Sequence, residues 1–266
     1  MEIIGYLAAA LIGISLSLIG GGGSILTVPV MVYLFSVQPS LATSYSLFVV
    51  GSASFVGAYT NYRKGLVNVK IALLFGVSSI ATVFLTRKFI IPLIPKIIWH
   101  DGNHTITESL LVMILFAVVM LLASISMIRN NDQQNEVGIY ADTSGLYKLP
   151  LYGVAIGLIT GLLGIGGGFL IIPVLVLLVG LPIKEAIGTS LFIIALNSFI
   201  GFMGDFGHFA IDWLFLFKIT LIAIGGIFVG YALNTRIQGR KLKRAFGWMV
   251  LVMAGLIITK EIFLKG

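Results

Sequence analysis

The sequence predicts an all-α, polytopic membrane protein, and its composition already points to this class. Hydrophobic residues make up 58% of the 266 residues and charged residues only 10%, with a mean hydropathy of +1.09. A soluble domain carries about 25% charged residues, so this chain has too little charge to cover a water-facing surface. A soluble enzyme, a disordered chain and a nucleic-acid-binding protein are therefore not expected, despite the net charge of +7.

Long uncharged runs predict the individual helices. A membrane-spanning helix needs about 20 mainly apolar residues, because its backbone groups must be paired within the segment. The runs are continuously apolar rather than alternating, which argues against the strands of a β-barrel. Six runs reach or approach the required length: Leu41–Tyr62, Val69–Thr86, Ser109–Ile128, Lys184–Gly204, Leu214–Thr235 and Ala245–Thr259.

Two further stretches are too long for one crossing, and glycine interrupts each of them. We expect each to form two short segments, either as two crossings or as one re-entrant hairpin. The polar run Arg129–Lys148 is expected to be a surface linker between a first repeat (1–128) and a second repeat (149–266). The short segments, four of ten in all, are Ile3–Ile19 with Ile25–Phe35 and Leu149–Leu163 with Phe169–Val179.

The two halves of the chain are related by a shift of 144 residues. Gly20–Pro29 (GGGGSILTVP) aligns with Gly164–Pro173 (GIGGGFLIIP), and Ala42–Phe48 (ATSYSLF) aligns with Ala186–Phe192 (AIGTSLF). Each half has five crossings if the short segments span the membrane and three if each short pair is a re-entrant hairpin. Both numbers are odd, so the second half is expected to enter the membrane inverted. Inverted repeats with glycine-broken helices at matching positions indicate a secondary transporter whose binding site lies near the midplane.

The basic residues predict the orientation of this topology, because Lys and Arg accumulate in cytoplasmic loops. Eleven fall on one side and five on the other, with Lys218 inside a segment. We therefore expect the first group in the cytoplasm and both termini outside. The first group is Arg63, Lys64, Lys70, Arg129, Lys148, Lys184, Arg236, Arg240, Lys241, Lys243 and Arg244; the second is Arg87, Lys88, Lys96, Lys260 and Lys265.

The glycine-rich breaks are the expected anion-binding groups. A helix that restarts at mid-membrane presents free N–H groups and the positive end of its dipole, which suit a small anion. The alternative is that these glycines only allow helices to pack closely. The expected binding residues at the breaks are Gly21, Gly22, Gly23, Ser24, Gly166, Gly167, Gly168 and Phe169.

Polar side chains in the following segments are expected to complete the site. Their hydroxyls could donate to an oxyanion, although bonding back to helix carbonyls is the alternative. Asp205 lies near a segment end beside His208 and Asp212, which favours an exposed loop position, and proton coupling would require it to face a cavity. The completing residues are Thr43, Ser44, Ser46, Thr189, Ser190 and Asn197.

Neither metal nor cofactor is expected. His100, Asp101, His104 and Glu108 are close in sequence, but the intervening Gly102 and Asn103 disfavour a helical pair of ligands. No Ser-His-Asp, His-Glu-x-x-His or Walker arrangement is present, so neither an enzyme nor an ATP-driven pump is expected.

The two glycine-rich segments that lead to a proline, together with Gly188-Thr189-Ser190, resemble the TauE/SafE family of sulfite and organosulfonate exporters. The resemblance runs from about Ile3 to Leu264, and the first half departs from it at Ala42–Ser46. It implies a bacterial cytoplasmic-membrane permease that exports sulfite or a related small sulfur-containing anion, with lipid but no nucleic acid as a partner. The alternatives are an importer of an organic sulfonate or carboxylate, a non-transporting membrane scaffold and an intramembrane metalloenzyme.

Overall fold

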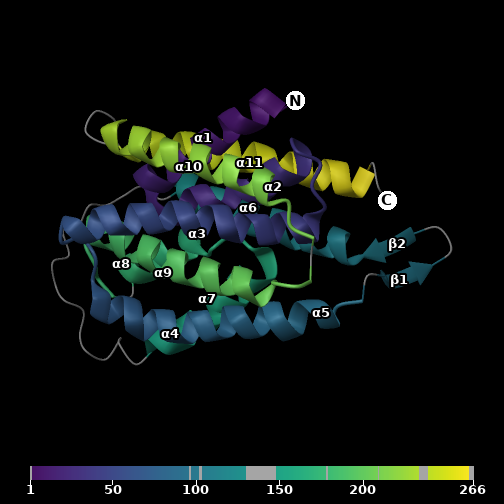
Figure 1. The fold of residues 1–266 in the computed structure, drawn as a ribbon, viewed down its shortest axis with the longest axis horizontal. Coiled ribbons are helices and arrows are strands. Elements are labelled where there is room, and N and C mark those ends of the chain that lie inside the picture. The colour runs from purple at the N-terminus through teal and green to yellow at the C-terminus, as the bar shows by residue number, and fades with distance from the viewer. Residues whose placement is uncertain are drawn as a thin grey trace.

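In the computed structural model, helices run along the long axis of the molecule (Figure 1). The structure describes residues 2–95, 97–101, 104–129, 148–177, 179–208, 210–233 and 239–263. The first half contains α1 (Glu2–Ile19), the 3₁₀ helix η1 (Gly20–Leu26), α2 (Thr27–Tyr33), α3 (Pro39–Arg63), α4 (Val69–Leu85), the π-helix η2 (Thr86–Ile90), α5 (Ile91–Leu93), β1 (Ile97–Asp101), β2 (His104–Thr107) and α6 (Glu108–Arg129). The second half contains α7 (Leu149–Leu163), α8 (Gly168–Leu177), α9 (Ile183–Gly204), α10 (Trp213–Leu233) and α11 (Gly239–Phe263).

Five of the six predicted long runs are confirmed as candidate membrane spans, and the sixth, predicted at Ala245–Thr259, is found as the shorter apolar helical stretch Gly247–Lys260. Within the described ranges, five helices are long and apolar enough to cross a membrane, and α7 has the bounds that hydropathy predicted. The segment expected from Ala245 begins earlier, at Gly239, because the Lys- and Arg-rich stretch before it also favours helix. The linker within 130–147 lies outside the described residues.

Helices α3 and α9 form the centre of the bundle. Their apolar spans are 72% and 67% buried, against 33–39% for the other long helices. They pack antiparallel, because Gly51 of α3 lies against Ser198 while Gly57, further along, lies against Leu191. The starts of α3 and α9 therefore lie at opposite ends of the bundle.

Each short helix pair is a re-entrant hairpin rather than two crossings. In the first pair, the Phe35 ring that follows α2 lies 5.5 Å from the Tyr6 ring near the start of α1. In the second pair, α7 runs parallel to α4, with Gly153 against Phe75 and Gly161 against Thr86, so α7 begins near the start of α4. The chain leaving α8 enters α9 at that same end, because the backbone N–H of Asn68, just before α4, donates to Thr189 near the start of α9. The chain thus enters and leaves each pair at the same end of the bundle.

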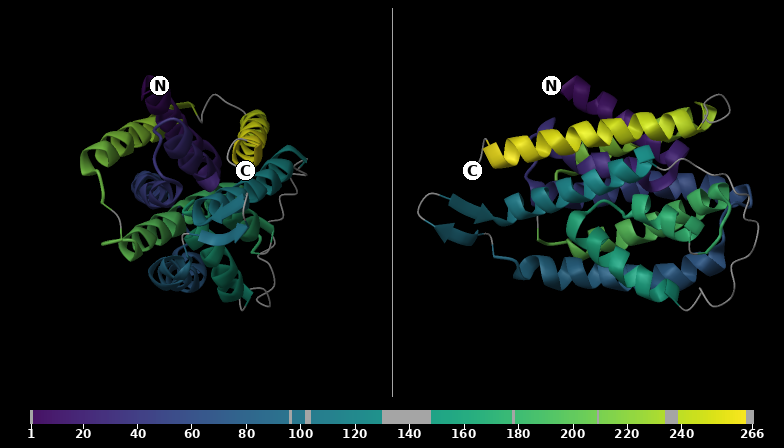
Figure 2. Two further views of the ribbon diagram at one scale, coloured as in Figure 1. Left: turned by 90° about the vertical axis from the view of Figure 1, so that its right-hand side faces the viewer. Right: turned by 180° about the vertical axis from the view of Figure 1, so that it is seen from behind.

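A small β-hairpin was not predicted by the hydropathy pattern. Strands β1 and β2 pair antiparallel, with Trp99 opposite Ile106 and His100 opposite Thr105. Their β-branched and aromatic residues favour strand. The hairpin projects beyond the helices at the end of the molecule where α11 also ends (Figures 1 and 2).

Close helix packing recurs at positions that are 144 residues apart. A Cβ on Gly13 of α1 would lie 1.9 Å from the carbonyl oxygen of Ala223 in α10. The equivalent Gly157 of α7 packs against Ser79 of α4, whose carbonyl oxygen would lie 2.7 Å from the added Cβ. The α1–α10 and α4–α7 interfaces therefore exchange under the internal repeat, and both rely on glycine for their close approach.

Adjacent glycines of α10 provide a test of this packing. A Cβ on Gly226 would lie 2.2 Å from the Ala10 carbonyl oxygen, whereas one on Gly225 would meet nothing within 4 Å. We expect Gly226→Ala to destabilise the fold by about 1–3 kcal/mol through overpacking and to lower the melting temperature in detergent. Gly225→Ala is the matched control and should keep the wild-type melting temperature or raise it slightly. Equal melting temperatures for the two variants would contradict this account of the interface.

Candidate functional site

The two glycine-rich breaks have different backbone conformations. The first was expected to leave helical geometry, but Gly20–Leu26 form a 3₁₀ helix in which only Gly20 has a positive φ, of 70°. A 3₁₀ helix keeps i→i+3 hydrogen bonds, so most backbone donors of this break have local partners. The second break does open, with positive φ at Gly164, Gly166 and Gly167. The two halves are therefore not equivalent as sources of free backbone N–H groups.

The breaks meet halfway along α9. A Cβ on Gly21 would lie 2.0 Å from the Cα of Gly168, and the side chain of Ile194 borders both glycines. This approach requires glycine at both positions, because a side chain on Gly21 or on Gly168 would clash with the backbone of the other break. The sequence expectation that the two breaks come together thus agrees with the geometry.

Two hydroxyls without a hydrogen-bond partner lie beside the second break, at the start of α8. The Thr160 and Ser198 side chains are fully buried, and neither hydroxyl is bonded within the described structure. A Cβ on Gly167 would lie 2.1 Å from Thr160 Oγ1, and one on Gly166 would lie 3.0 Å from Ser198 Oγ. Since the first N–H groups of a helix lack intrahelical acceptors, this small region gathers donors that suit an anion.

Several predicted hydroxyls instead bond to nearby backbone. Ser24 Oγ donates to the Gly21 carbonyl at 2.7 Å, and Ser190 Oγ donates to the Ile187 carbonyl at 2.9 Å. Thr189 Oγ1 accepts the backbone N–H of Asn68 at 2.9 Å. The Ser24 and Ser190 contacts follow the back-bonding alternative, whereas Thr189 instead joins α9 to the residue that precedes α4.

The remaining predicted residues are distributed along the same core. Asn197 Nδ2 donates to Ser79 Oγ at 2.7 Å, while Asn197 Oδ1 and the buried Ser46 hydroxyl have no partner in the described structure. Gly22 and Gly23 lie within η1, where Gly23 packs against α1. The side chain of Phe169 lies outside the described residues.

Asp205 is buried rather than exposed, and it pairs with a residue that the sequence analysis placed on a surface. Arg87 Nη1 donates to Asp205 Oδ2 at 2.9 Å, and the two side chains are 1% and 3% exposed. Arg87 Nη1 also lies 3.1 Å from Thr43 Oγ1, and the adjacent Ser44 hydroxyl is buried without a hydrogen-bond partner in the described structure. Gly164 abuts the guanidinium, since a Cβ there would lie 2.5 Å from Nη2. We call Thr43, Ser44, Arg87, Gly164 and Asp205 the Arg87 cluster.

Helix ends explain how a charge is accommodated in this cluster. Gly164 is the C-cap of α7 and Asp205 is the C-cap of α9. The negative ends of both helix dipoles therefore face the Arg87 guanidinium. With Arg87 inside the protein, the basic residues assigned to the two surfaces divide eleven against four, which strengthens the charge bias used to predict orientation.

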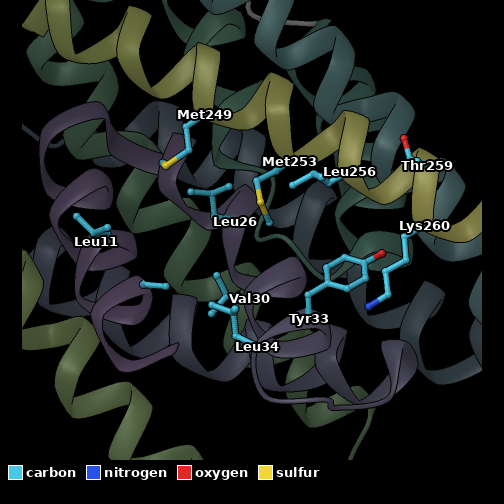
Figure 3. Close-up of a pocket in the computed structure, with 11 residues that line it drawn as sticks. Leu11, Leu26, Val30, Tyr33, Leu34, Met249, Met253, Leu256, Thr259 and Lys260 are labelled. Carbon is cyan, nitrogen blue, oxygen red and sulfur yellow. The ribbon is translucent and has the colours of Figure 1, made fainter. Parts of the chain in front are cut away.

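A separate hollow of about 500 Å³ lies between α1, α2 and α11 (Figure 3). Its lining is almost wholly apolar, with Thr259 and Lys260 at one end, where Lys260 Nζ lies 4.5 Å from the centre of the Tyr33 ring. Few hydrogen-bond donors reach this space, so it does not match the chemistry of an anion site. The apolar lining is Ala8, Leu11, Leu26, Val30, Leu34, Met249, Met253 and Leu256, with Tyr33 beside them.

The buried ion pair makes a prediction about stability. Asp205→Ala leaves the Arg87 charge buried without its counter-ion, which should destabilise the fold by about 3–5 kcal/mol. Adding Arg87→Met to Asp205→Ala should recover most of this loss, because the uncompensated charge is then gone. Melting temperatures of the single and double variants in detergent measure both effects. A double variant less stable than Asp205→Ala alone would refute this electrostatic account.

Comparison with known proteins agrees with this architecture. The family described as "Sulfite exporter TauE/SafE" matches residues 5–257. A "Probable membrane transporter protein" of Xylella fastidiosa (strain 9a5c) is 28% identical over 96% of this chain and 94% of its own length. The "Probable membrane transporter protein YdhB" of Bacillus subtilis (strain 168) is 26% identical over 93% of this chain and 96% of its own length. No solved structure matches the chain significantly. The chain therefore belongs to the TauE/SafE family of membrane transporters.

Proposed function

We propose that this protein exports sulfite or a related small sulfur-containing anion across the cytoplasmic membrane of a bacterial cell. The observation that carries the proposal is the meeting of the two glycine-rich breaks through Gly21 and Gly168, beside the unpartnered hydroxyls of Thr160 and Ser198. Backbone N–H groups at the start of α8 and these hydroxyls donate to the anion's oxygens. The family description, which names a sulfite exporter, supports the choice of anion.

This binding site contains donors but no basic side chain against Gly166, Gly167 or Gly168, where α8 begins. Hydrogen bonds to a charged group contribute about 1.5–3 kcal/mol each, so a few donors hold an anion without preventing its release. A membrane potential that is negative inside favours anion exit by about 2.3 kcal/mol per charge per 100 mV. Outward flux therefore needs no coupled ion.

We further propose that the two halves are inverted repeats that rock against each other. The exchange of the α1–α10 and α4–α7 interfaces at equivalent glycines, Gly13 and Gly157, supports this relation. The breaks of the two re-entrant pairs also extend toward opposite ends of the bundle, since Gly20 lies near Ser190 of α9 and Gly164 lies near Thr43 at the start of α3. Such an arrangement gives each side of the membrane its own half of the pathway.

The unpartnered hydroxyls provide the direct test of the site. We expect Thr160→Val and Ser198→Ala each to reduce sulfite efflux from proteoliposomes about tenfold, the effect of losing one hydrogen bond to a charged ligand. Efflux is measured at mildly alkaline pH, with membrane potential and pH gradient imposed separately. Flux that follows the potential alone supports uncoupled export.

Ser124→Ala is the matched control for these variants. Ser124 is a buried hydroxyl on α6 that already donates to the Leu121 carbonyl at 2.8 Å, so its loss should leave efflux unchanged. Folded Thr160→Val and Ser198→Ala variants with wild-type efflux would exclude the proposed site. If the protein transports a sulfonate or carboxylate but not sulfite, the proposed substrate is wrong and the site stands. If no tested anion is transported, a non-transporting membrane scaffold is favoured.

The proposed orientation has its own test, because the chain contains no cysteine. Ser144→Cys places a thiol in the linker and Lys265→Cys places one near the C-terminus. In intact cells, a membrane-impermeant maleimide should label Lys265→Cys and leave Ser144→Cys unlabelled until the cells are opened. The reverse pattern would place the termini in the cytoplasm.

A further inference from the structure

The guanidinium of Arg87 has one hydrogen-bonding edge in use and one edge free. Nη1 contacts Asp205 and Thr43, whereas Nε and Nη2 have no partner within the described structure. An arginine presents its N–H groups in fixed forks, and Nε with Nη2 forms a complete fork that matches two oxygens of one anion. A buried cation with an unused fork is costly unless a ligand completes it in some state.

The backbone at Arg87 directs this side chain into the protein. Arg87 lies in η2, a π-helical segment, and such segments occur frequently at functional sites. The neighbouring Lys88 is exposed and lies over the Phe84 and Phe89 rings, 5.3 and 5.8 Å from their centres. Two consecutive basic residues thus have opposite environments, and only Arg87 reaches the core.

The internal repeat indicates that packing alone does not require a charge here. A shift of 144 residues takes Arg87 to Tyr231, and Asn61 to Asp205. Asn61 Nδ2 donates to Tyr231 Oη at 2.6 Å and to the Gly57 carbonyl at 2.9 Å. The fold therefore closes the equivalent contact with a neutral pair.

We propose that the free Nε–Nη2 edge of Arg87 is a second anion-binding station, at the Gly164 end of the second break and nearer the end of the bundle where α9 ends. The proposal rests on the proposed function, because it assigns the residue that discriminates the transported anion. Asp205 holds Nη1 and fixes the plane of the guanidinium, so the fork points in one direction. A side chain at Gly164 would clash with Nη2, so glycine leaves this edge of the guanidinium uncovered by a side chain from the second break.

The geometry of the fork selects the class of anion. Two parallel N–H donors bind sulfite, sulfonate or carboxylate oxygens as a pair, whereas a halide offers a single acceptor centre. Arg87 is buried in this conformation, so the anion reaches the fork in a state in which the second break and η2 have separated. Ser44 and Thr86 are two further buried hydroxyls without a hydrogen-bond partner in the described structure, next in sequence to Thr43 and Arg87.

Purified protein in detergent tests this station without requiring transport. The readout is the rise in melting temperature with sulfite or methanesulfonate, relative to chloride at equal ionic strength. Arg87→Lys keeps the charge opposite Asp205 but removes the fork, and it should weaken the apparent affinity for both anions about tenfold or more. The second variant, Arg87→Tyr with Asp205→Asn, reproduces the neutral Tyr231–Asn61 pair and should fold normally but lose the anion-dependent rise.

Lys88→Gln is the control, because it removes the adjacent cation from the outer surface and should respond to both anions like the wild type. The proposed station would be wrong if Arg87→Lys or the double variant bound the anions with wild-type affinity. It would also be wrong if neither anion raised the melting temperature of the wild type. Efflux measurements separate this proposal from the proposed function. If the wild type exports sulfite but the Arg87 variants bind anions as tightly as the wild type, only the second station is rejected. If the Arg87 variants lose the anion-dependent rise in melting temperature but the wild type shows no efflux, only the export function is rejected.

Discussion

The architecture depends on one constraint: a backbone that leaves helical geometry inside a membrane must be covered by protein. Every residue from Gly164 to Gly168 is buried, and the first break stays helical as a 3₁₀ segment. The two most buried of the long helices, α3 and α9, provide this cover, with Val50 and Ile194 lying against Gly166. Glycine then permits contact between the breaks, since the Gly21 and Gly168 backbones touch directly. The central helices, the re-entrant pairs and the donors at the second break are all consequences of that requirement.

Polar groups in the core are arranged at three levels along α9. The Asn61–Tyr231 pair lies toward its start, the meeting of the breaks lies at its middle, and the Arg87–Asp205 pair lies at its end. Neutral donors occupy the first two levels and charge occupies the third. An anion that moves along this axis would therefore leave a region of dipoles and approach a cation, which suits movement in stages rather than deep trapping at one point.

Hydropathy and the internal repeat predicted most of the fold. Uninterrupted apolar runs fix helix bounds closely, as the agreement for α7 illustrates, and aligned glycines correctly brought the two breaks together. Four consecutive glycines are compatible both with an open turn and with a 3₁₀ helix, because glycine adopts positive and negative φ with similar ease. The conformation of the first break could therefore not be predicted. Arg87 was misplaced because a charge at the end of an apolar run has the same pattern whether it faces water or turns inward. Extending the repeat alignment to Tyr231 would have provided the missing signal.

The unequal ends of the bundle have a consequence for the transport cycle. A duplicated protein with identical ends would open toward either side with the same energy. In the rocking cycle proposed above, one opening would break a neutral hydrogen-bonded pair, while the other would separate or hydrate a buried ion pair, a change with a much larger electrostatic component. The two half-cycles of that proposal would then differ in rate and in their response to salt. The opening at the Arg87–Asp205 end would be the more salt-sensitive of the two, so an asymmetric salt dependence of transport is the consequence of this ion pair.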